Sequence, residues 1–259
     1  MGVVEAVLRI AGFTRRSLAW LCGIAGLLAY NWWVLAPFKH GLMRSPNELF
    51  SNLEVTGQPY AIVMQRADVT AGILLLFAFI LAGSRTVIEG RREWLGMVVF
   101  AMAGAIGGLF PQVCADGLSP ACMSAEWHFR LAASQYVHDG SGVIEFAGIT
   151  LALLLAVMRI RGNGASPGGR PPGSPRSTPT ARGYRVIGWV VLVAYPVLGV
   201  GYLFNFYGAV IEAVFFSAFT AMVLLQLSER LARRNELSPD PGPGMMNRWD
   251  PIASPDAPL

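Results

Sequence analysis

Residues 94–113 read WLGMVVFAMAGAIGGLFPQV and contain no charged side chain. A helix of about 20 apolar residues crosses the hydrocarbon core of a bilayer, where every backbone polar group must be hydrogen-bonded within the segment. The rest of the chain has the same character, since 54% of its 259 residues are hydrophobic and only 14% are charged. A soluble domain carries about 25% charged residues. The composition therefore predicts an integral membrane protein.

Five more apolar stretches are long enough to be spans, which predicts an all-α fold: a polytopic bundle of about six transmembrane helices. The six stretches are residues 17–38, 69–84 (with a start as early as Tyr60), 94–113, 135–160, 186–204 and 207–227. The first is too long for the apolar part of a secretory signal, and no small-residue cleavage site follows it. We therefore expect an uncleaved first helix.

The basic residues predict the orientation of these helices. With the N-terminus inside, 16 of the 20 Lys and Arg residues fall in cytoplasmic segments, and the four outside are Lys39, Arg44, Arg66 and Arg130. Positive charge collects on the cytoplasmic side of membrane proteins. Both termini are thus expected in the cytoplasm. The net charge of +4 lies beside apolar segments, so it indicates topology and not a nucleic-acid partner.

The domain organisation follows from shifts in composition. We expect a four-helix front part with outer loops at 1–161, a disordered cytoplasmic linker rich in Gly, Pro, Ser and Arg at 162–184, a two-helix back part at 185–234, and a disordered cytoplasmic tail at 235–259. The Arg-rich, Lys-poor usage is typical of a high-GC bacterium. The outer loops at 40–59 and 111–134 are longer than the topology requires, and the first is expected to form a short helix or a structured cap.

The three cysteines cannot form a disulfide scaffold. Cys22 falls inside the first apolar stretch, where it is expected to be a buried small hydrophobe. Cys114 and Cys122 flank a short loop on the predicted outer side. They could pair there, because an extracellular loop faces an oxidising compartment.

Polar residues gather at the outer start of the fourth stretch. Ser134, His138, Ser141 and Glu145 have the spacing i, i+4, i+7 and i+11, which keeps them within about 60° of one another on a helix. They form one stripe that descends from the outer surface into the membrane, whereas Asp139 points to a different neighbour. Charged groups inside a bilayer usually face a partner or a water-filled cavity.

Three interpretations of this stripe remain open. The first is structural, with Glu145 meeting Arg66 or Arg130 and His138 meeting Asp68 between helices. The second is recognition of a ligand or lipid headgroup, and the third is acid–base catalysis. The candidate binding residues are Ser134, His138, Asp139, Ser141, Glu145 and His128, and the candidate catalytic residues are His138, Glu145, Asp68 and Glu212.

The motifs give no sign of a metal or cofactor. All three histidines, His40, His128 and His138, fall on the outer side, yet no HxxxH or HExxH pair exists. A phosphate-binding Gly-rich loop, a nucleophile elbow and a redox CxxC are also missing from the sequence. We therefore expect no metal site and no cofactor.

Several short motifs resemble those of an actinobacterial family of multi-pass membrane proteins of unknown function, itself distantly similar to the DRAM/Sfk-like membrane family. They are Tyr30-Asn31-Trp32-Trp33, Phe110-Pro111, Cys114-Ala115-Asp116 with Cys122, His128, and Ser134 with His138-Asp139 and Ser141. The resemblance covers about residues 17–228. It implies a compact helical bundle with an outer loop, and no established reaction.

Three functions are compatible with these features. The leading one is a non-catalytic plasma-membrane protein that associates with membrane lipids or organises another membrane protein through an outward-facing polar pocket. The second is a membrane-embedded lipid hydrolase or isoprenoid cyclase that uses His138 and Glu145 as acid and base, within aromatic walls from Trp32, Trp33, Tyr202 and Tyr207. A transporter is the third, and the lack of charged residues in the inner halves of the helices argues against it.

Overall fold

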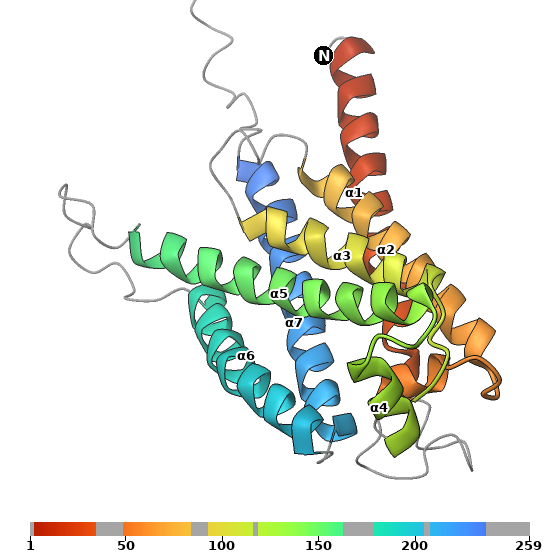
Figure 1. Cartoon of the computed structure of the whole chain (residues 1–259). Coiled ribbons are helices and arrows are strands. Elements are labelled where there is room, and N and C mark those ends of the chain that lie inside the picture. The colour runs from red at the N-terminus through yellow and green to blue at the C-terminus, as the bar shows by residue number, and fades with distance from the viewer. Residues whose placement is uncertain are drawn as a thin grey trace, which may run out of the picture.

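The computed structural model describes residues 3–34, 49–83, 93–115, 119–162, 179–204 and 208–236. Its elements, in chain order, are α1 (Val3–Tyr30), the 3-10 helix η2 (Phe50–Glu54), α2 (Ala61–Gly83), α3 (Glu93–Leu109), α4 (Pro120–Trp127), α5 (Ala133–Gly162), α6 (Pro179–Phe204) and α7 (Gly208–Glu236) (Figure 1). These residues form seven α-helices and no strand, so the all-α prediction is confirmed for them.

Three of these helices are long and apolar enough to cross a membrane. They contain the spans Ala61–Ala82 in α2, Ala133–Met158 in α5 and Ala209–Ser228 in α7, and the shorter Glu93–Leu109 helix is also apolar. Each of the six apolar stretches of the sequence falls on a helix of the structure. The count of six spans and the cytoplasmic location of both ends stay predictions.

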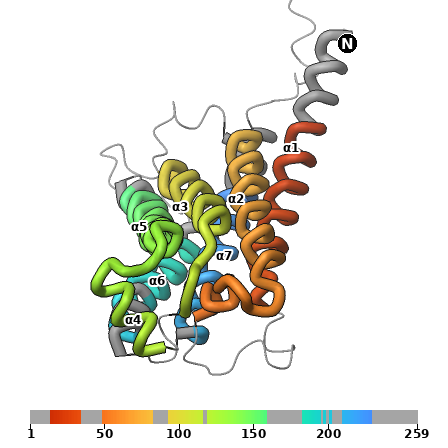
Figure 2. Tube along the Cα trace, turned by 45° about the vertical axis from the view of Figure 1, so that its right-hand side comes forward, coloured from red at the N-terminus to blue at the C-terminus, as the bar shows by residue number. Residues whose placement is uncertain are grey.

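Neighbours along the chain are mostly neighbours in space. Helix α1 packs against α2, α2 against α3, α3 against α5, α5 against α6, and α6 against α7 (Figures 1 and 2). The Arg15 guanidinium Nε donates a 2.8 Å hydrogen bond to the Leu81 carbonyl near the end of α2. This contact makes α1 and α2 an antiparallel pair and satisfies a carbonyl that the end of α2 leaves without a helical partner.

Glycines let the central helices approach each other closely. A Cβ added at Gly96 of α3 would lie 2.4 Å from the Gly148 carbonyl oxygen of α5, and one at Gly108 would lie 2.5 Å from the Gln65 carbonyl oxygen of α2. No side chain fits at either position. Gly104 and Gly108, which are four residues apart as in a GxxxG pattern, therefore face different neighbours, since Gly104 points toward Glu145 on α5 whereas Gly108 contacts α2.

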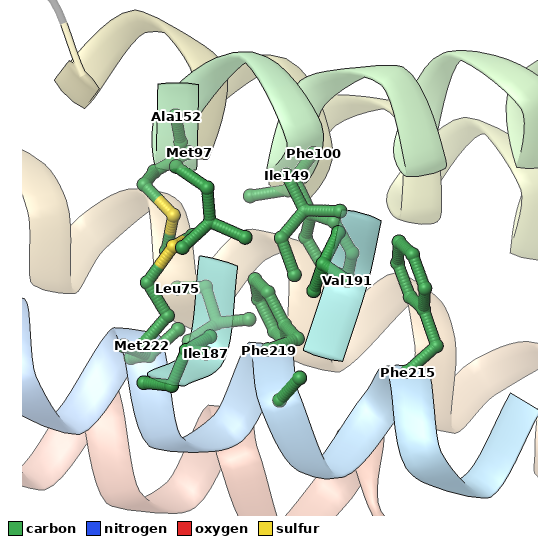
Figure 3. Packing of buried hydrophobic residues seen from close by; sticks show 14 of the residues in the cluster. Leu75, Met97, Phe100, Ile149, Ala152, Ile187, Val191, Phe215, Phe219 and Met222 are labelled. Carbon is green, nitrogen blue, oxygen red and sulfur yellow. The ribbon is translucent and has the colours of Figure 1, made fainter. Parts of the chain in front are cut away.

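The apolar core joins α1, α2, α3, α5, α6 and α7 (Figure 3). Phe100 of α3 stacks on Phe219 of α7 with ring centroids 3.6 Å apart. Tyr30, at the end of α1, meets Phe100, Phe216 and Phe219 edge-on at centroid distances of 5.1–5.3 Å. The Tyr30 ring thus belongs to the core, while its hydroxyl lies at the edge of that core.

Large apolar side chains remain exposed on the outside of the bundle. Phe77 of α2 is 54% exposed, Trp189 of α6 is 67% exposed and Leu154 of α5 is 56% exposed. Extended apolar surface of this kind marks contact with another apolar phase. Lipid is compatible with that role for helices of this length and composition.

Several helix boundaries differ from the sequence prediction, among them the end of α3 at Leu109 and not at residue 113, and two of the differences have a visible cause. Helix α1 ends at Tyr30 and not at residue 38, because the Asn31 side-chain amide donates a 2.8 Å hydrogen bond to the Leu27 carbonyl and caps the helix there. Helix α6 begins at Pro179, within the segment expected to be a disordered linker. Tyr184 lies on the same apolar face as Ile187 and Val191, and is buried with them. Residues 163–178 of the linker and 237–259 of the tail lie outside the described residues.

Candidate functional site

A cavity of about 510 Å³ lies where segments from seven parts of the chain meet. Its walls come from the end of α1, from η2, from α2, from α3 with the segment after it, from α4, from the first turns of α5 and from the start of α7. Figure 2 shows α4 and the beginning of α2 at this same end of the bundle. The volume is within the range of about 300–1,000 Å³ that small-molecule sites occupy.

The 3-10 helix η2 closes one side of the cavity because three other elements hold it. The Glu212 carboxylate of α7 accepts a hydrogen bond from the Phe50 amide. The Gln65 side chain of α2 donates to the Glu54 carbonyl at 2.7 Å. Just beyond η2, the amide and hydroxyl of Thr56 both donate to the Gln112 carbonyl at 2.9 Å.

His138 joins α5 to the end of α3. Its ring Nδ1 lies 3.1 Å from the carbonyl oxygens of both Gly107 and Phe110. Carbonyl oxygens only accept hydrogen bonds, so Nδ1 carries a proton. The ring is buried and gives a further donor to two carbonyls at the C-terminal end of α3. The Nε2 atom is the nitrogen left for any other partner.

One turn and two turns further along α5, Ser141 and Glu145 face the glycines of α3. The Ser141 hydroxyl donates to the His138 carbonyl at 2.6 Å, and a Cβ at Gly107 would lie 2.7 Å from its oxygen. The Glu145 Oε1 atom would lie 3.0 Å from a Cβ at Gly104. Glycine at 104 and 107 therefore leaves the room into which these polar side chains extend.

Glu145 also meets the end of α1. Its carboxyl group interacts with the Tyr30 hydroxyl across the cavity, although neither the hydroxyl nor Oε1 makes a hydrogen bond of normal geometry. Tyr30 is buried and Glu145 is half-buried. A tyrosine hydroxyl anchored by an aromatic cluster is thus held opposite a carboxyl group near the middle of the bundle.

A second pair of carboxyl groups lies beside this one. The side chains of Glu54 and Asp68 interact with each other, and the Trp32 indole N–H donates to Asp68. Burial raises the pKa of Glu54 well above its ordinary value, and the adjacent charge of Asp68 raises that pKa further. Two carboxyl groups hydrogen-bond to each other only when one carries a proton. His138 also lies close to Asp68 and interacts electrostatically with its carboxyl group.

Hydrogen bonds connect Asp139 to the segment that precedes Cys114. Its Oδ1 atom accepts from the side-chain amides of Gln112 at 3.4 Å and Gln135 at 3.3 Å. Gln135, which is fully buried, also accepts from the Val113 amide at 2.9 Å. Cys114 and Cys122 lie at disulfide distance with Cα atoms 6.0 Å apart, so the pairing expected for this loop is supported by the structure.

The structure brings most of the candidate residues together. Eight of the candidate residues named from the sequence line the cavity: His138, Asp139, Ser141, Glu145, Asp68, Glu212, Trp32 and Trp33. Ser134 and His128 are not among the lining residues, and the His128 Nδ1 lies 2.6 Å from the Ser124 carbonyl oxygen at the end of α4. Asp139 was expected to point away from the stripe; it lines the same cavity as His138, Ser141 and Glu145, and its side chain accepts from Gln112 and Gln135.

The structural interpretation of the stripe is only partly correct. His138 does lie near Asp68, as that interpretation proposes. Arg66 and Arg130, the suggested partners of Glu145, are both exposed and neither lines the cavity. The partner of Glu145 is Tyr30, whose side chain lines the cavity from the end of α1. His40 and Tyr207 lie outside the described residues, as does the side chain of Tyr202.

Four further residues of the site are not identified by sequence reasoning: Tyr30, Glu54, Gln112 and Gln135. Tyr30 reads as an interfacial aromatic and Glu54 as an ordinary loop carboxylate. The two glutamines carry no charge, and helical spacing alone does not reveal what they contact. Helix α4 lies inside a segment that was expected to be a loop. The pair Ser119-Pro120 indicates the start of this helix, because the Ser119 hydroxyl caps it and proline fits its first turn.

The residues of the cavity do not suggest a metal centre. Within the described ranges, no three His, Cys, Asp or Glu side chains are arranged to hold a metal ion. The donors are carboxylates and amides spread over several walls, and the one imidazole has its Nδ1 atom engaged by backbone carbonyls. The site is an acidic and aromatic cavity.

Comparison with known proteins identifies a family and no individual relative. No curated protein and no solved structure matches the chain. A family model described as "Protein of unknown function (DUF998)" matches residues 23–229, which include all the helices that line the cavity. The actinobacterial origin and the similarity to the DRAM/Sfk-like family stay predictions. The chain therefore belongs to the DUF998 family of proteins of unknown function.

Proposed function

We propose that this protein spans the plasma membrane about six times and holds a lipid-derived or small-molecule ligand, without transforming it, in an outward-facing cavity. Three described helices have the length and composition of spans. The arginine distribution favours an orientation in which the cysteine loop and the start of α5 lie on the outer side of the membrane. In this orientation the cavity opens away from the cytoplasm, where it could also present its ligand to a partner membrane protein.

One observation carries this proposal. Tyr30, Glu54, Asp68, Glu145 and Glu212 come from five separate segments, yet all line the same cavity. Polar groups inside a membrane bundle are expensive unless they face a partner or a polar cavity. These residues contact one another or the backbone, and together they surround a space of about 510 Å³, which pairing between helices alone does not require.

The test is whether the cavity retains a ligand. We expect native mass spectrometry of the full chain, purified from its own membranes in a mild detergent, to show bound lipid or metabolite. Val143 lines the cavity and is 62% exposed, so a Val143→Trp variant narrows the cavity without burying the new ring in the core. Val137 is on the same helix and is not a lining residue, which makes Val137→Trp the matched control.

The bound mass should disappear in Val143→Trp and remain in Val137→Trp. Wild-type protein that carries no extra mass would overturn the proposal, and so would two variants that retain the same mass to the same extent.

A membrane-embedded enzyme is the second candidate, because His138 and Glu145 share the cavity with Asp68 and Glu212. With Nδ1 engaged by carbonyls, Nε2 of His138 is the atom that would move a proton. A lipid hydrolase should turn over a fluorescent phospholipid in mixed micelles, and a cyclase should consume a polyprenyl diphosphate. His138→Ala and Glu145→Gln should then abolish turnover in folded protein, whereas a wild type inactive on both substrates supports the binding role.

A further inference from the structure

We infer that the cavity recognises an organic ammonium group that carries N–H donors, either as the headgroup of a lipid or as a free primary amine. This inference rests on the proposed binding function and names the chemical class of its ligand. It follows from the unpaired acceptors, the charge, the aromatic walls and the size of the cavity.

The first observation is a set of buried acceptor atoms on residues that line the cavity, none of which makes a hydrogen bond of normal geometry to the described residues. They are Oε1 of Gln112, Oε2 of Glu54 and Oε1 of Glu145. The Gln112 and Glu54 side chains are each only 4% exposed. Since Gln112 Nε2 donates to the Asp139 carboxylate, its oxygen is the atom left facing the cavity. Such acceptors call for a ligand that donates hydrogen bonds.

The second observation is the sign of the charge. Six acidic side chains line the cavity: Glu54, Asp68, Glu126, Asp139, Glu145 and Glu212. No lysine or arginine of the described ranges is among the lining residues. His138 is the one basic side chain, and its Nδ1 proton is directed at backbone carbonyls. A cavity lined this way attracts the positively charged part of a ligand.

The third observation is the aromatic wall. Trp33 and Phe50 lie with ring centroids 4.8 Å apart, and Phe216 lies 5.8 Å from Trp33 and 6.4 Å from Phe50. These three rings and Tyr30 all line the cavity. Aromatic faces attract ammonium groups and pack against the carbon atoms attached to them. Carboxylates beside aromatic rings are therefore the surroundings that an alkylammonium group favours.

The volume of the cavity and its hydrogen-bond acceptors indicate which class of cation it would bind. A cavity of about 510 Å³ suits an organic group rather than a bare ion. No metal-binding group of side chains occurs in the described part of the chain. A quaternary ammonium would use the aromatic rings but could not donate to Gln112, Glu54 and Glu145. A primary ammonium has three N–H donors and satisfies both requirements.

The experiment uses the full chain in nanodiscs of phosphatidylglycerol and has two arms. In the soluble arm, ethanolamine and choline are titrated and binding is followed by isothermal titration calorimetry. In the lipid arm, phosphatidylethanolamine or phosphatidylcholine is added in increasing amounts and bound lipid is counted by native mass spectrometry. Each arm compares a primary with a quaternary ammonium on the same carbon skeleton, and the arm that gives binding identifies the source.

The matched variants are Glu145→Gln, which keeps the shape of a lining side chain and removes its charge, and Glu93→Gln, which changes a buried carboxyl group of α3 that does not line the cavity. We expect the primary ammonium to bind about tenfold more tightly than the quaternary one, and Glu145→Gln to weaken it about tenfold, with Glu93→Gln close to wild type. If Glu145→Gln does not fold, Val143→Trp should abolish the same binding.

Equal affinity for choline and ethanolamine headgroups, or equal affinity in Glu145→Gln and wild type, would overturn the inference. The failure of the inference is distinguishable from that of the proposed function. Protein that retains a native ligand sensitive to Val143→Trp but binds no amine in either arm refutes the ammonium chemistry alone. Protein that retains no ligand and binds no amine refutes both.

Discussion

The carboxylate of Glu212, near the start of α7, accepts a hydrogen bond from the backbone amide of Phe50 in η2, across 162 positions of sequence. Both groups are buried. The bond fixes η2 against the helix bundle, and through η2 it sets the position of Glu54 in the cavity. Glu212 therefore supports the shape of the site as well as lining it.

Replacement of Glu212 tests this anchoring. Glu212→Ala should lower the free energy of unfolding in detergent by about 1–3 kcal/mol, because the buried Phe50 amide loses its acceptor. Glu212→Gln keeps an acceptor oxygen in a side chain of the same length, so its loss should be clearly smaller. Denaturant unfolding followed by tryptophan fluorescence measures both. Identical losses in the two variants would show that the hydrogen bond does not hold η2.

The contact between Gly107 and Ser141 predicts a substitution and its rescue. A Cβ at position 107 would lie 2.7 Å from the Ser141 hydroxyl oxygen. Gly107→Ala should therefore destabilise the protein by about 1–3 kcal/mol through overpacking. Adding Ser141→Ala removes the oxygen and should restore most of the loss, as measured by the melting temperature.

Gly142→Ala provides the control for that pair. It lies on α5 and also lines the cavity, but nothing is within 4 Å of an added Cβ. Alanine is favoured over glycine in a helix by about 1 kcal/mol, so this variant should be neutral or more stable. A double variant at 107 and 141 that is no more stable than Gly107→Ala would refute the proposed contact.

Glu54 predicts how stability depends on pH. Burial, with a contribution from nearby Asp68, raises the folded-state pKa of Glu54 well above the model-compound value of 4.5. An acid with a raised pKa contributes most below its unfolded pKa, and the contribution is lost as pH rises through the folded pKa. The melting temperature in detergent should therefore fall as pH increases from about 4.5.

Glu54→Gln is neutral at every pH and should flatten this slope. Asp68, Glu145 and Glu212 also face Glu54, so part of the dependence should remain. Melting curves of wild type and variant across the same pH series give the comparison. An unchanged slope in Glu54→Gln would mean that Glu54 ionises as freely in the folded protein as in the unfolded chain.

The cysteine loop allows the orientation to be measured. After mild reduction of intact cells, a membrane-impermeant maleimide should label Cys114 and Cys122, because the loop is expected outside. A cysteine placed by Pro171→Cys, in the predicted cytoplasmic linker, should react only after lysis. Cys22 lies in α1 and is half-buried, so it should react poorly in either case. Labelling of position 171 in intact cells would reverse the proposed topology.

Much of the architecture could be read from the chain because the bilayer imposes simple rules. The stretch at 94–113 and its five counterparts each fall on a helix, since a long apolar run must satisfy its own backbone in lipid. Helix ends were harder to place. Asn31 ends α1 by bonding to the Leu27 carbonyl, and Tyr184 extends the buried face of α6 into a segment whose Arg and Gly residues suggested disorder.

The candidate site was partly predictable for a similar reason. His138, Ser141 and Glu145 lie on one face of α5 by helical periodicity alone, and all three line the cavity. Periodicity says nothing about which helix that face meets. Tyr30, Glu54 and Gln112 line the cavity only because the packing of the chain brings them next to residues that are distant in sequence.

The sequence by itself determined a helical membrane-type chain, its helices, the sorting of its charges and the polar face of α5, because composition and periodicity act locally. Only the tertiary structure decided that glycines at 104 and 107 leave space for that face, and that Glu145 meets Tyr30 and not an arginine. Close approach of helices depends on contacts between residues far apart in the chain, and no local pattern encodes which side chains such contacts will bring together.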